Sequence, residues 1–217
     1  MIEAVIFDLD GTLVNSLLDL ANASNFALSF YGFPTHETEK YKYFVGNGIP
    51  KLIYRITPKD KRDEATLNKI SEKFFENYNV HYADNTYVYS GIKELIAKLK
   101  ETGIKTAVVT NKAHAAAIEV INSLLPDTFD LVLGQRPEIP TKPDPTLTLM
   151  AMEKLEVKPD ECIFMGDSGM DVKTGVNSGA LPVGVLWGYR KEDELLENGA
   201  KYIIENPGEL IKIINEN

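Results

Sequence analysis

The chain has 217 residues, of which 23 are Lys or Arg and 32 are Asp or Glu, giving a formal net charge of −9. This length allows one large domain, or one domain with a sizeable insert, with enough apolar residues for a core. The acidic balance lacks the basic patch that binding to a nucleic-acid backbone requires, so we expect no nucleic-acid partner.

The sequence also indicates a compartment. The one cysteine, Cys162, cannot form an internal disulfide, which fits a reducing cytosol. No apolar run approaches the ~20 residues that span a bilayer, and the first residues lack the basic start of a signal peptide. We therefore expect a cytoplasmic protein with no membrane partner, while the sequence gives no indication of an oligomeric state.

Short apolar, β-branched runs alternate with helical patterns along most of the chain, which is typical of βα units and a mostly parallel sheet. We expect helices over 92–99, closed by Gly103, and over 113–121. The fold class that follows is α/β, with a Rossmann-like core. The expected strands, nearly all apolar as in a sheet covered on both faces, are residues 4–7, 105–109, 131–133, 162–165 and 183–186.

One long segment interrupts this alternation. Residues 17–79 show helical periodicity and no convincing strand, with apolar stripes that begin at Leu17 and at Leu67. This pattern predicts an inserted helical unit whose aromatic and apolar stripes form its own core. We predict a catalytic core made of residues 1–15 and 84–217, and a helical cap domain made of residues 16–83.

Pairs of carboxylates follow two of the expected strands. Asp8 and Asp10 end the first, and Asp167 and Asp171 follow the fourth. Because ligands bind at the carboxyl ends of strands in open α/β sheets, and because clustered anions need a cation, the pairs suggest a hard metal such as Mg²⁺. The alternatives are solvated acidic turns and, for Asp171, a cap on the next helix.

Groups suited to phosphate follow the other strands. Thr110 and Asn111 supply a hydroxyl and an amide at the start of a helix, and Lys142 stands in a loop stiffened by two prolines. Taken alone, Thr110 is better interpreted as a helix cap, and most lysines are solvated surface charges.

Four motifs occur in the order that is typical of the haloacid dehalogenase-like hydrolase superfamily, and the chain resembles that superfamily. They are Asp-x-Asp-x-Thr at 8–12, a hydrophobic residue and Thr at 109–110, Lys142, and Gly-Asp-x-x-x-Asp at 166–171. The resemblance implies a phosphate ester hydrolase, in which Asp8 is the nucleophile that forms an aspartyl-phosphate. Asp10 would then be the general acid and base.

The same resemblance implies the remaining site residues. Mg²⁺ would be held by Asp8, the backbone carbonyl of Asp10 and Asp167, with Asp171 in or near that shell. Thr110, Asn111 and Lys142 would offset the phosphoryl charge. The insert resembles the helical cap that closes over the site in one branch of the superfamily.

Within the superfamily, the chain is most similar to the phosphoglycolate phosphatase subfamily. Gly46, Asn47 and Gly48 resemble a glycine loop of its cap, and Arg55 is placed to reach a substrate carboxylate. Each has a structural alternative, a tight interhelical turn for the loop and a solvated helix charge for Arg55. Asn15 stands where the family more often has Asp, which leaves the dynamics of the cap open.

We therefore expect a Mg²⁺-dependent phosphatase for a small phosphorylated metabolite, with 2-phosphoglycolate as the best single candidate. A pyrophosphatase, a nucleotidase and a β-phosphoglucomutase-like enzyme are the alternatives within this chemistry. A non-catalytic binding protein is disfavoured, because Asp8, Asp10, Lys142 and Asp167 are all present.

Overall fold

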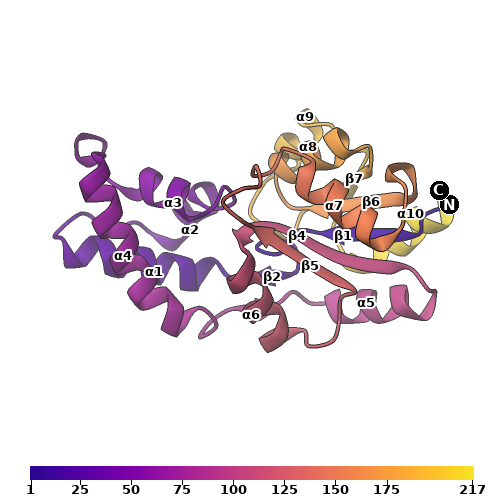
Figure 1. Cartoon of the computed structure of the whole chain (residues 1–217), viewed down its shortest axis with the longest axis horizontal. Helices are drawn as coiled ribbons and strands as arrows, with labels where there is room; N and C mark the ends of the chain where they lie inside the picture. Colours follow the sequence, from indigo (N-terminus) through magenta and orange to yellow (C-terminus); the bar gives the residue numbers. More distant parts are fainter. The chain divides into compact units, whose positions relative to one another are not determined.

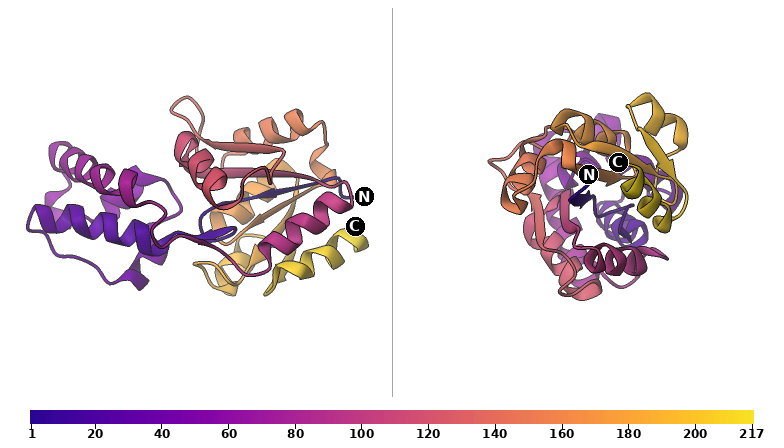
Figure 2. Two further views of the ribbon diagram at one scale, coloured as in Figure 1. Left: turned by 90° about the horizontal axis from the view of Figure 1, so that it is seen from below. Right: turned by 90° about the vertical axis from the view of Figure 1, so that its right-hand side faces the viewer.

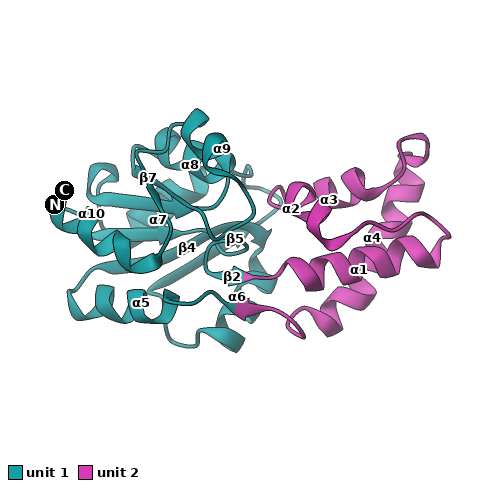
Figure 3. Ribbon diagram, turned by 180° about the vertical axis from the view of Figure 1, so that it is seen from behind, with its two compact units in different colours: residues 1–14, 88–217 teal, residues 15–87 magenta.

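The computed structural model describes residues 1–217, which form two compact units (Figure 3). Unit 1 consists of Met1–Val14 and Val88–Asn217, and unit 2 of Asn15–Tyr87. The short strands β2 (Val14–Asn15) and β3 (Tyr87–Val88) pair with each other where the chain passes between the units. The predicted division into a catalytic core and a helical cap domain stays a prediction.

Unit 1 is built on a six-stranded parallel sheet with the order β5-β4-β1-β6-β7-β8 (Figure 1). The first strand lies in the middle, and the chain builds outward from it first on one side and then on the other. This arrangement places a topological switch point, where ligands bind in such sheets, at the carboxyl end of β1. The strands are β1 (Ala4–Phe7), β4 (Lys105–Ala113), β5 (Leu131–Gln135), β6 (Cys162–Gly166), β7 (Leu181–Val185) and β8 (Tyr202–Ile204).

Helices cover both faces of this sheet. Helices α7 and α8 lie on the opposite face from α5 and α10 (Figures 1 and 2). On one face, Ile6, Val109 and Phe164 pack against Leu147 and Met152 of α7, all buried. The helices of unit 1 are α5 (Ile92–Glu101), α6 (His114–Leu124), α7 (Thr146–Leu155), α8 (Gly169–Ser178), α9 (Glu192–Glu197) and α10 (Leu210–Glu216), with the 3₁₀ turns η2 (Pro159–Glu161) and η3 (Pro207–Glu209).

Unit 2 is a small helical bundle. Helix α1 packs against α4 and α2, and α3 packs against α2 and α4. Its core includes the fully buried Tyr41 and Phe74, and the Tyr41 hydroxyl donates a 2.7 Å hydrogen bond to Asn25 Oδ1. The helices are α1 (Leu17–Phe30), α2 (Thr38–Phe44), α3 (Ile49–Ile56) and α4 (Glu64–His81), with the 3₁₀ turn η1 (Lys59–Lys61).

The predicted α/β class, parallel sheet and inserted helical segment are confirmed. The sheet contains one strand that was not among those expected, β8, and β4 continues past Val109 to Ala113 with a shift of register against β5 after Thr110. Thr110, Asn111 and Lys112 in this extension are polar or charged, so the sequence there lacks the apolar run that predicts a buried strand. No helix in the structure combines the length and the apolar character needed to cross a membrane.

The buried carboxylate of Asp19 connects the beginning and the end of unit 2 by hydrogen bonds. The Asp19 side chain, only 3% exposed, accepts hydrogen bonds from the main-chain N–H of Asn85 at 3.0 and 3.1 Å. It also accepts from Asn85 Nδ2 at 2.8 Å and from Thr86 Oγ1 at 2.6 Å. These charge-assisted bonds fix the start of α1 against the segment that leads into β3.

We predict that Asp19→Ala lowers the free energy of unfolding by about 3 kcal/mol, because it removes a buried carboxylate that accepts hydrogen bonds from Asn85 and Thr86. Chemical denaturation at pH 7 measures this change. Asp60→Ala is the matched control, because the Asp60 side chain is 76% exposed and its removal should change stability by less than about 0.5 kcal/mol. Equal stability of the two variants would contradict a structural role for Asp19.

Candidate active site

The first strand delivers Asp8 to the switch point of the sheet. Strand β1 lies between β4 and β6, with Phe7 in register with Val108 on one side and with Met165 on the other. The Asp8 N–H donates a 2.9 Å hydrogen bond to Met165 O, which continues the ladder by one step. Asp167 follows the end of β6, so two carboxylates leave adjacent strands at the same edge.

Three carboxylates form a buried cluster at this edge. Asp8, Asp167 and Asp171 each offer an oxygen within 4.8 Å of the others, and all three side chains are almost inaccessible to water. Burial, and next the charge of Asp171, raise the pKa of Asp8 to about 6. Burial, followed by the charges of Asp171 and Asp8, raises the pKa of Asp167 as well.

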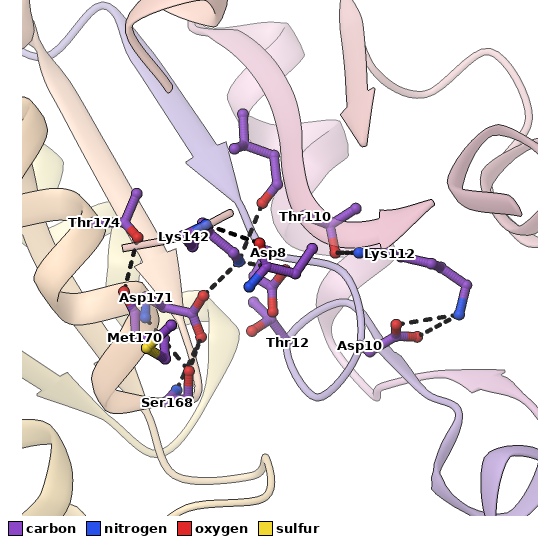
Figure 4. A network of polar contacts seen from close by, with 12 residues as sticks. Asp8, Asp10, Thr12, Thr110, Lys112, Lys142, Ser168, Met170, Asp171 and Thr174 are labelled. Atoms are coloured by element: carbon purple, nitrogen blue, oxygen red, sulfur yellow. Dashed lines mark hydrogen bonds and ion pairs between the residues drawn. The ribbon is translucent and has the colours of Figure 1, made fainter. Parts of the chain in front are cut away.

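Lys142 supplies the positive charge inside this cluster (Figure 4). Its Nζ lies 2.7 Å from Asp8 Oδ1 and 2.5 Å from Asp171 Oδ1, and the side chain is 3% exposed. Burial disfavours the ammonium form, but the two carboxylates outweigh burial and raise the pKa of Lys142. The loop that carries it is fixed from β4, because Asn111 Oδ1 accepts the Lys142 N–H at 2.9 Å.

Asp171 takes part in the cap of α8 that the sequence left open and also belongs to the carboxylate cluster. Its Oδ1 pairs with Lys142, while its Oδ2 accepts from the Ser168 N–H at 3.0 Å and the Ser168 hydroxyl at 2.6 Å. Ser168 in turn caps α8, so the helix start fixes the carboxylate. Gly166 permits this close packing, because a Cβ there would lie 2.1 Å from the Cβ of Asp171.

Asp167 is fixed from two other segments. Its Oδ2 accepts the Tyr189 N–H at 2.8 Å, and its Oδ1 accepts the Thr12 hydroxyl at 3.4 Å. The backbone approaches this carboxylate so closely that a Cβ on Gly11 would lie 2.4 Å from Asp167 Oδ2. A Cβ on Gly188 would lie 2.2 Å from Asp167 Cβ, so both positions need glycine.

The remaining predicted residues of unit 1 lie at the carboxyl end of β4, except Asp10, which follows β1. Thr110 is 2% exposed, and its Oγ1 accepts the Lys112 N–H at 3.2 Å. Asp10 does not point into the carboxylate cluster. Its two oxygens accept hydrogen bonds from Lys112 Nζ at 3.2 and 3.1 Å. In Figure 4 this pair lies on the opposite side of Thr110 from Asp8.

The predicted specificity residues belong to unit 2: Gly46, Asn47 and Gly48 form the turn between α2 and α3, and Arg55 lies in α3. Gly46 and Gly48 have φ values of 101° and 79°, which favour glycine. Arg55 is engaged with this turn, because Nη1 donates to Phe44 O at 2.8 Å and Nη2 to Asn47 Oδ1 at 2.7 Å. Its guanidinium therefore supports the glycine turn.

The structure thus gathers Asp8, Asp167, Asp171 and Lys142 in one cluster and places Thr110 and Asn111 beside it. Sequence reasoning gave no role to Lys112, although its position two residues after Thr110 at the same strand end was a usable signal. The contacts made by Ser168 and by the Tyr189 main chain had no such signal, since one depends on a helix cap and the other on backbone.

The donor set of the cluster fits a hard divalent cation. It consists of carboxylates, which Mg²⁺ prefers, and they are buried with one ammonium for three potential negative charges. Asp8 Oδ1 is buried and lies 2.7 Å from Lys142 Nζ, so this oxygen already faces one cation in the structure.

Comparison with known proteins agrees with this geometry. The family described as haloacid dehalogenase-like hydrolase matches residues 5–185. The chain is 33% identical to a phosphoglycolate phosphatase of Chromobacterium violaceum, over 98% of this chain and 96% of that protein. It is 28% identical to a phosphoglycolate phosphatase of Aquifex aeolicus, over 98% and 97%.

Solved structures agree as well. A crystal structure of a predicted phosphoglycolate phosphatase from Haemophilus somnus superposes with a TM-score of 0.90 at 27% identity, covering 98% of this chain and 97% of that one. A predicted phosphatase from Clostridium acetobutylicum gives a TM-score of 0.88 at 25% identity, with 100% of both chains covered.

The raised pKa of Asp8 predicts a pH-dependent stability in the absence of metal. Between an ordinary value of 3.8 and about 6, the folded protein binds more protons at Asp8 than the unfolded chain does. The contribution of Asp8 to the free energy of unfolding should therefore be most favourable below pH 4, and it should fall as the pH rises to 6 and above. The shift corresponds to about 3 kcal/mol.

Chemical denaturation in EDTA between pH 4 and 7 tests this expectation. Asp8→Asn should remove the Asp8 part of the decline and be more stable than the unsubstituted protein at pH 7, while Asp60→Asn should follow the unsubstituted protein. If the free energy of unfolding of Asp8→Asn changed with pH in parallel with that of the unsubstituted protein, the ionised Asp8 carboxylate would not be destabilised by its surroundings.

Proposed function

Because the chain belongs to the haloacid dehalogenase-like hydrolase family, we propose that it is a Mg²⁺-dependent phosphatase that hydrolyses a small phosphomonoester, with 2-phosphoglycolate as the best candidate. The observation that carries the proposal is the placement of Asp8, at the switch point of the sheet, against the buried ammonium of Lys142 and two further carboxylates. Relatives aligned over the full length are phosphatases by name.

The reaction proceeds in two displacements at phosphorus. A carboxylate oxygen of Asp8 attacks, the bond between phosphorus and the ester oxygen breaks, and Asp10 gives a proton to the departing oxygen. Asp10, now a carboxylate, takes a proton from a water molecule that attacks the aspartyl-phosphate. The bond between phosphorus and Asp8 then breaks, which releases phosphate and restores the nucleophile.

Mg²⁺ would be held by Asp8, the main-chain carbonyl of Asp10, and Asp167. When bound, it would neutralise negative charge on the phosphoryl group and on its carboxylate ligands. We place Asp171 at the edge of this shell, because its two oxygens already have Lys142 and Ser168 as partners. Its main contribution is then to hold the Lys142 ammonium in place.

The residues of β4 and of the loop after β5 bind the phosphoryl oxygens. Lys142 keeps its positive charge next to Asp8, so it offsets the negative charge that both the nucleophile and the phosphoryl group bring. The Thr110 hydroxyl and the Asn111 amide lie at the neighbouring strand end, and Asn111 also fixes the Lys142 loop. Phosphoryl transfer depends mainly on such positioning and electrostatics.

We predict that the protein releases phosphate from 2-phosphoglycolate with at least about 10-fold higher kcat/KM than from sugar phosphates, nucleotides or pyrophosphate, and that EDTA abolishes this activity. Asp8→Asn should lower turnover by at least about 10³-fold, because the substituted residue has no carboxylate to attack phosphorus. A phosphate-release assay over this panel measures both effects.

Asp60→Asn is the matched control, because it makes the same chemical change at an exposed position of unit 2 and should keep full activity. Equal, weak and Mg²⁺-dependent hydrolysis of all esters would retain the chemistry and reject 2-phosphoglycolate. Undiminished turnover by Asp8→Asn would reject Asp8 as the nucleophile.

We further propose that the turn of Gly46, Asn47 and Gly48, supported by Arg55, determines substrate preference. Arg55 donates hydrogen bonds to both Phe44 O and Asn47 Oδ1, and Arg55→Lys should lose this paired contact, because an ammonium lacks the planar, forked geometry of a guanidinium. We expect the ratio of kcat/KM for 2-phosphoglycolate to that for p-nitrophenyl phosphate to fall about 5-fold or more. Lys59→Met, at an exposed site in unit 2, is the control, and equal losses on both substrates would reject this role.

A further inference from the structure

The mechanism above leaves one buried basic residue of unit 1 without a role. Lys112 follows Thr110 and Asn111 at the end of β4, and its side chain is only 6% exposed. Its Nζ lies 3.1 and 3.2 Å from the two oxygens of Asp10, whose side chain is 18% exposed. An ammonium that contacts both oxygens of a carboxylate in such a setting is a strong, directed interaction.

The position of the Lys112–Asp10 pair distinguishes the leaving-group side of the site from the side of the nucleophile. Asp8 attacks phosphorus from the cluster that holds Lys142, whereas Asp10 must reach the oxygen that leaves. Lys112 contacts Asp10 and lies across Thr110 from Lys142 (Figure 4). Lys112 is therefore the cation on the leaving-group side of the site, and this placement rests on the proposed function of Asp10.

An anionic leaving group would find an oppositely charged partner, Lys112, on this side of the site. In 2-phosphoglycolate a single methylene carbon separates the ester oxygen from a carboxylate, so the carboxylate necessarily lies close to the group that protonates that oxygen. A cation within hydrogen-bond distance of Asp10 is thus within reach of the substrate carboxylate when Asp10 turns to the ester oxygen. A neutral leaving group offers Lys112 no such replacement for Asp10.

We propose that Lys112 is a specificity-determining residue that binds the carboxylate of the substrate's leaving group, and that Asp10 occupies this place when substrate is absent. Lys112 is already desolvated and oriented by Asp10, so exchanging one carboxylate for another avoids most of the cost of burying and ordering a free lysine. The exchange also frees the Asp10 side chain to turn toward the ester oxygen. The substrate class is a phosphomonoester with an anionic group one carbon from the ester oxygen.

The test compares a charged substrate with neutral analogues of similar size. The kcat/KM values for 2-phosphoglycolate, for its uncharged amide and for ethyl phosphate are measured for the unsubstituted protein, Lys112→Met and Lys112→Arg. We expect Lys112→Met to lower kcat/KM for 2-phosphoglycolate by about 30-fold or more, while the values for the amide and ethyl phosphate change by less than about 3-fold. Lys112→Arg, which keeps the charge, should restore most of the preference.

Other outcomes overturn the proposal. Equal losses on charged and neutral substrates would mean that Lys112 acts only by positioning Asp10, and an unchanged preference would mean that another group binds the carboxylate. Lys112→Met is checked for folding by its thermal transition, and if it is unfolded, the comparison is made with Lys112→Gln and Lys112→Arg. Failure of the unsubstituted protein to hydrolyse 2-phosphoglycolate, with activity on the neutral esters, would instead reject the proposed substrate.

Discussion

The structure of the site depends on one ammonium group that neutralises a buried cluster of carboxylates. Three carboxylates removed from water repel one another strongly, and Lys142 is the cation that lies among them, in contact with Asp8 and Asp171. This need explains why the main chain of Lys142 is itself anchored, through Asn111 on a neighbouring strand. The pKa of Asp8 is raised mainly by burial and next by Asp171, so the Lys142 ammonium offsets only part of the cost of burying this carboxylate.

The order of the strands makes this cluster possible. Because β1 lies between β4 and β6, residues from three distant parts of the sequence reach one edge without any long loop. The backbone there comes so close to Asp167 that Gly11 and Gly188 cannot carry side chains. The precision of the site therefore comes from rigid strand ends and from glycines that allow close contact.

The fold and the carboxylates could be predicted from the sequence because both depend on local patterns. Apolar runs mark buried strands, and Asp8 and Asp167 directly follow two of them. The end of β4 could not be predicted, since its last residues pair with β5 through an irregular register and carry polar side chains. The dual role of Asp171 depends on the distance between a helix start and a loop, and sequence spacing does not encode that distance.

Under the proposed mechanism, the two ammonium groups also explain how neighbouring aspartates can have different tasks. Asp8 and Asp10 are two residues apart, but Asp8 faces Lys142 and two carboxylates, whereas Asp10 faces Lys112 at a more accessible position. A nucleophile must stay fixed in line with phosphorus, and burial among fixed charges provides this. An acid and base must turn between an ester oxygen and a water molecule, so its partner has to be one that a substrate can replace. Lys112 meets this requirement when the substrate itself carries an anion.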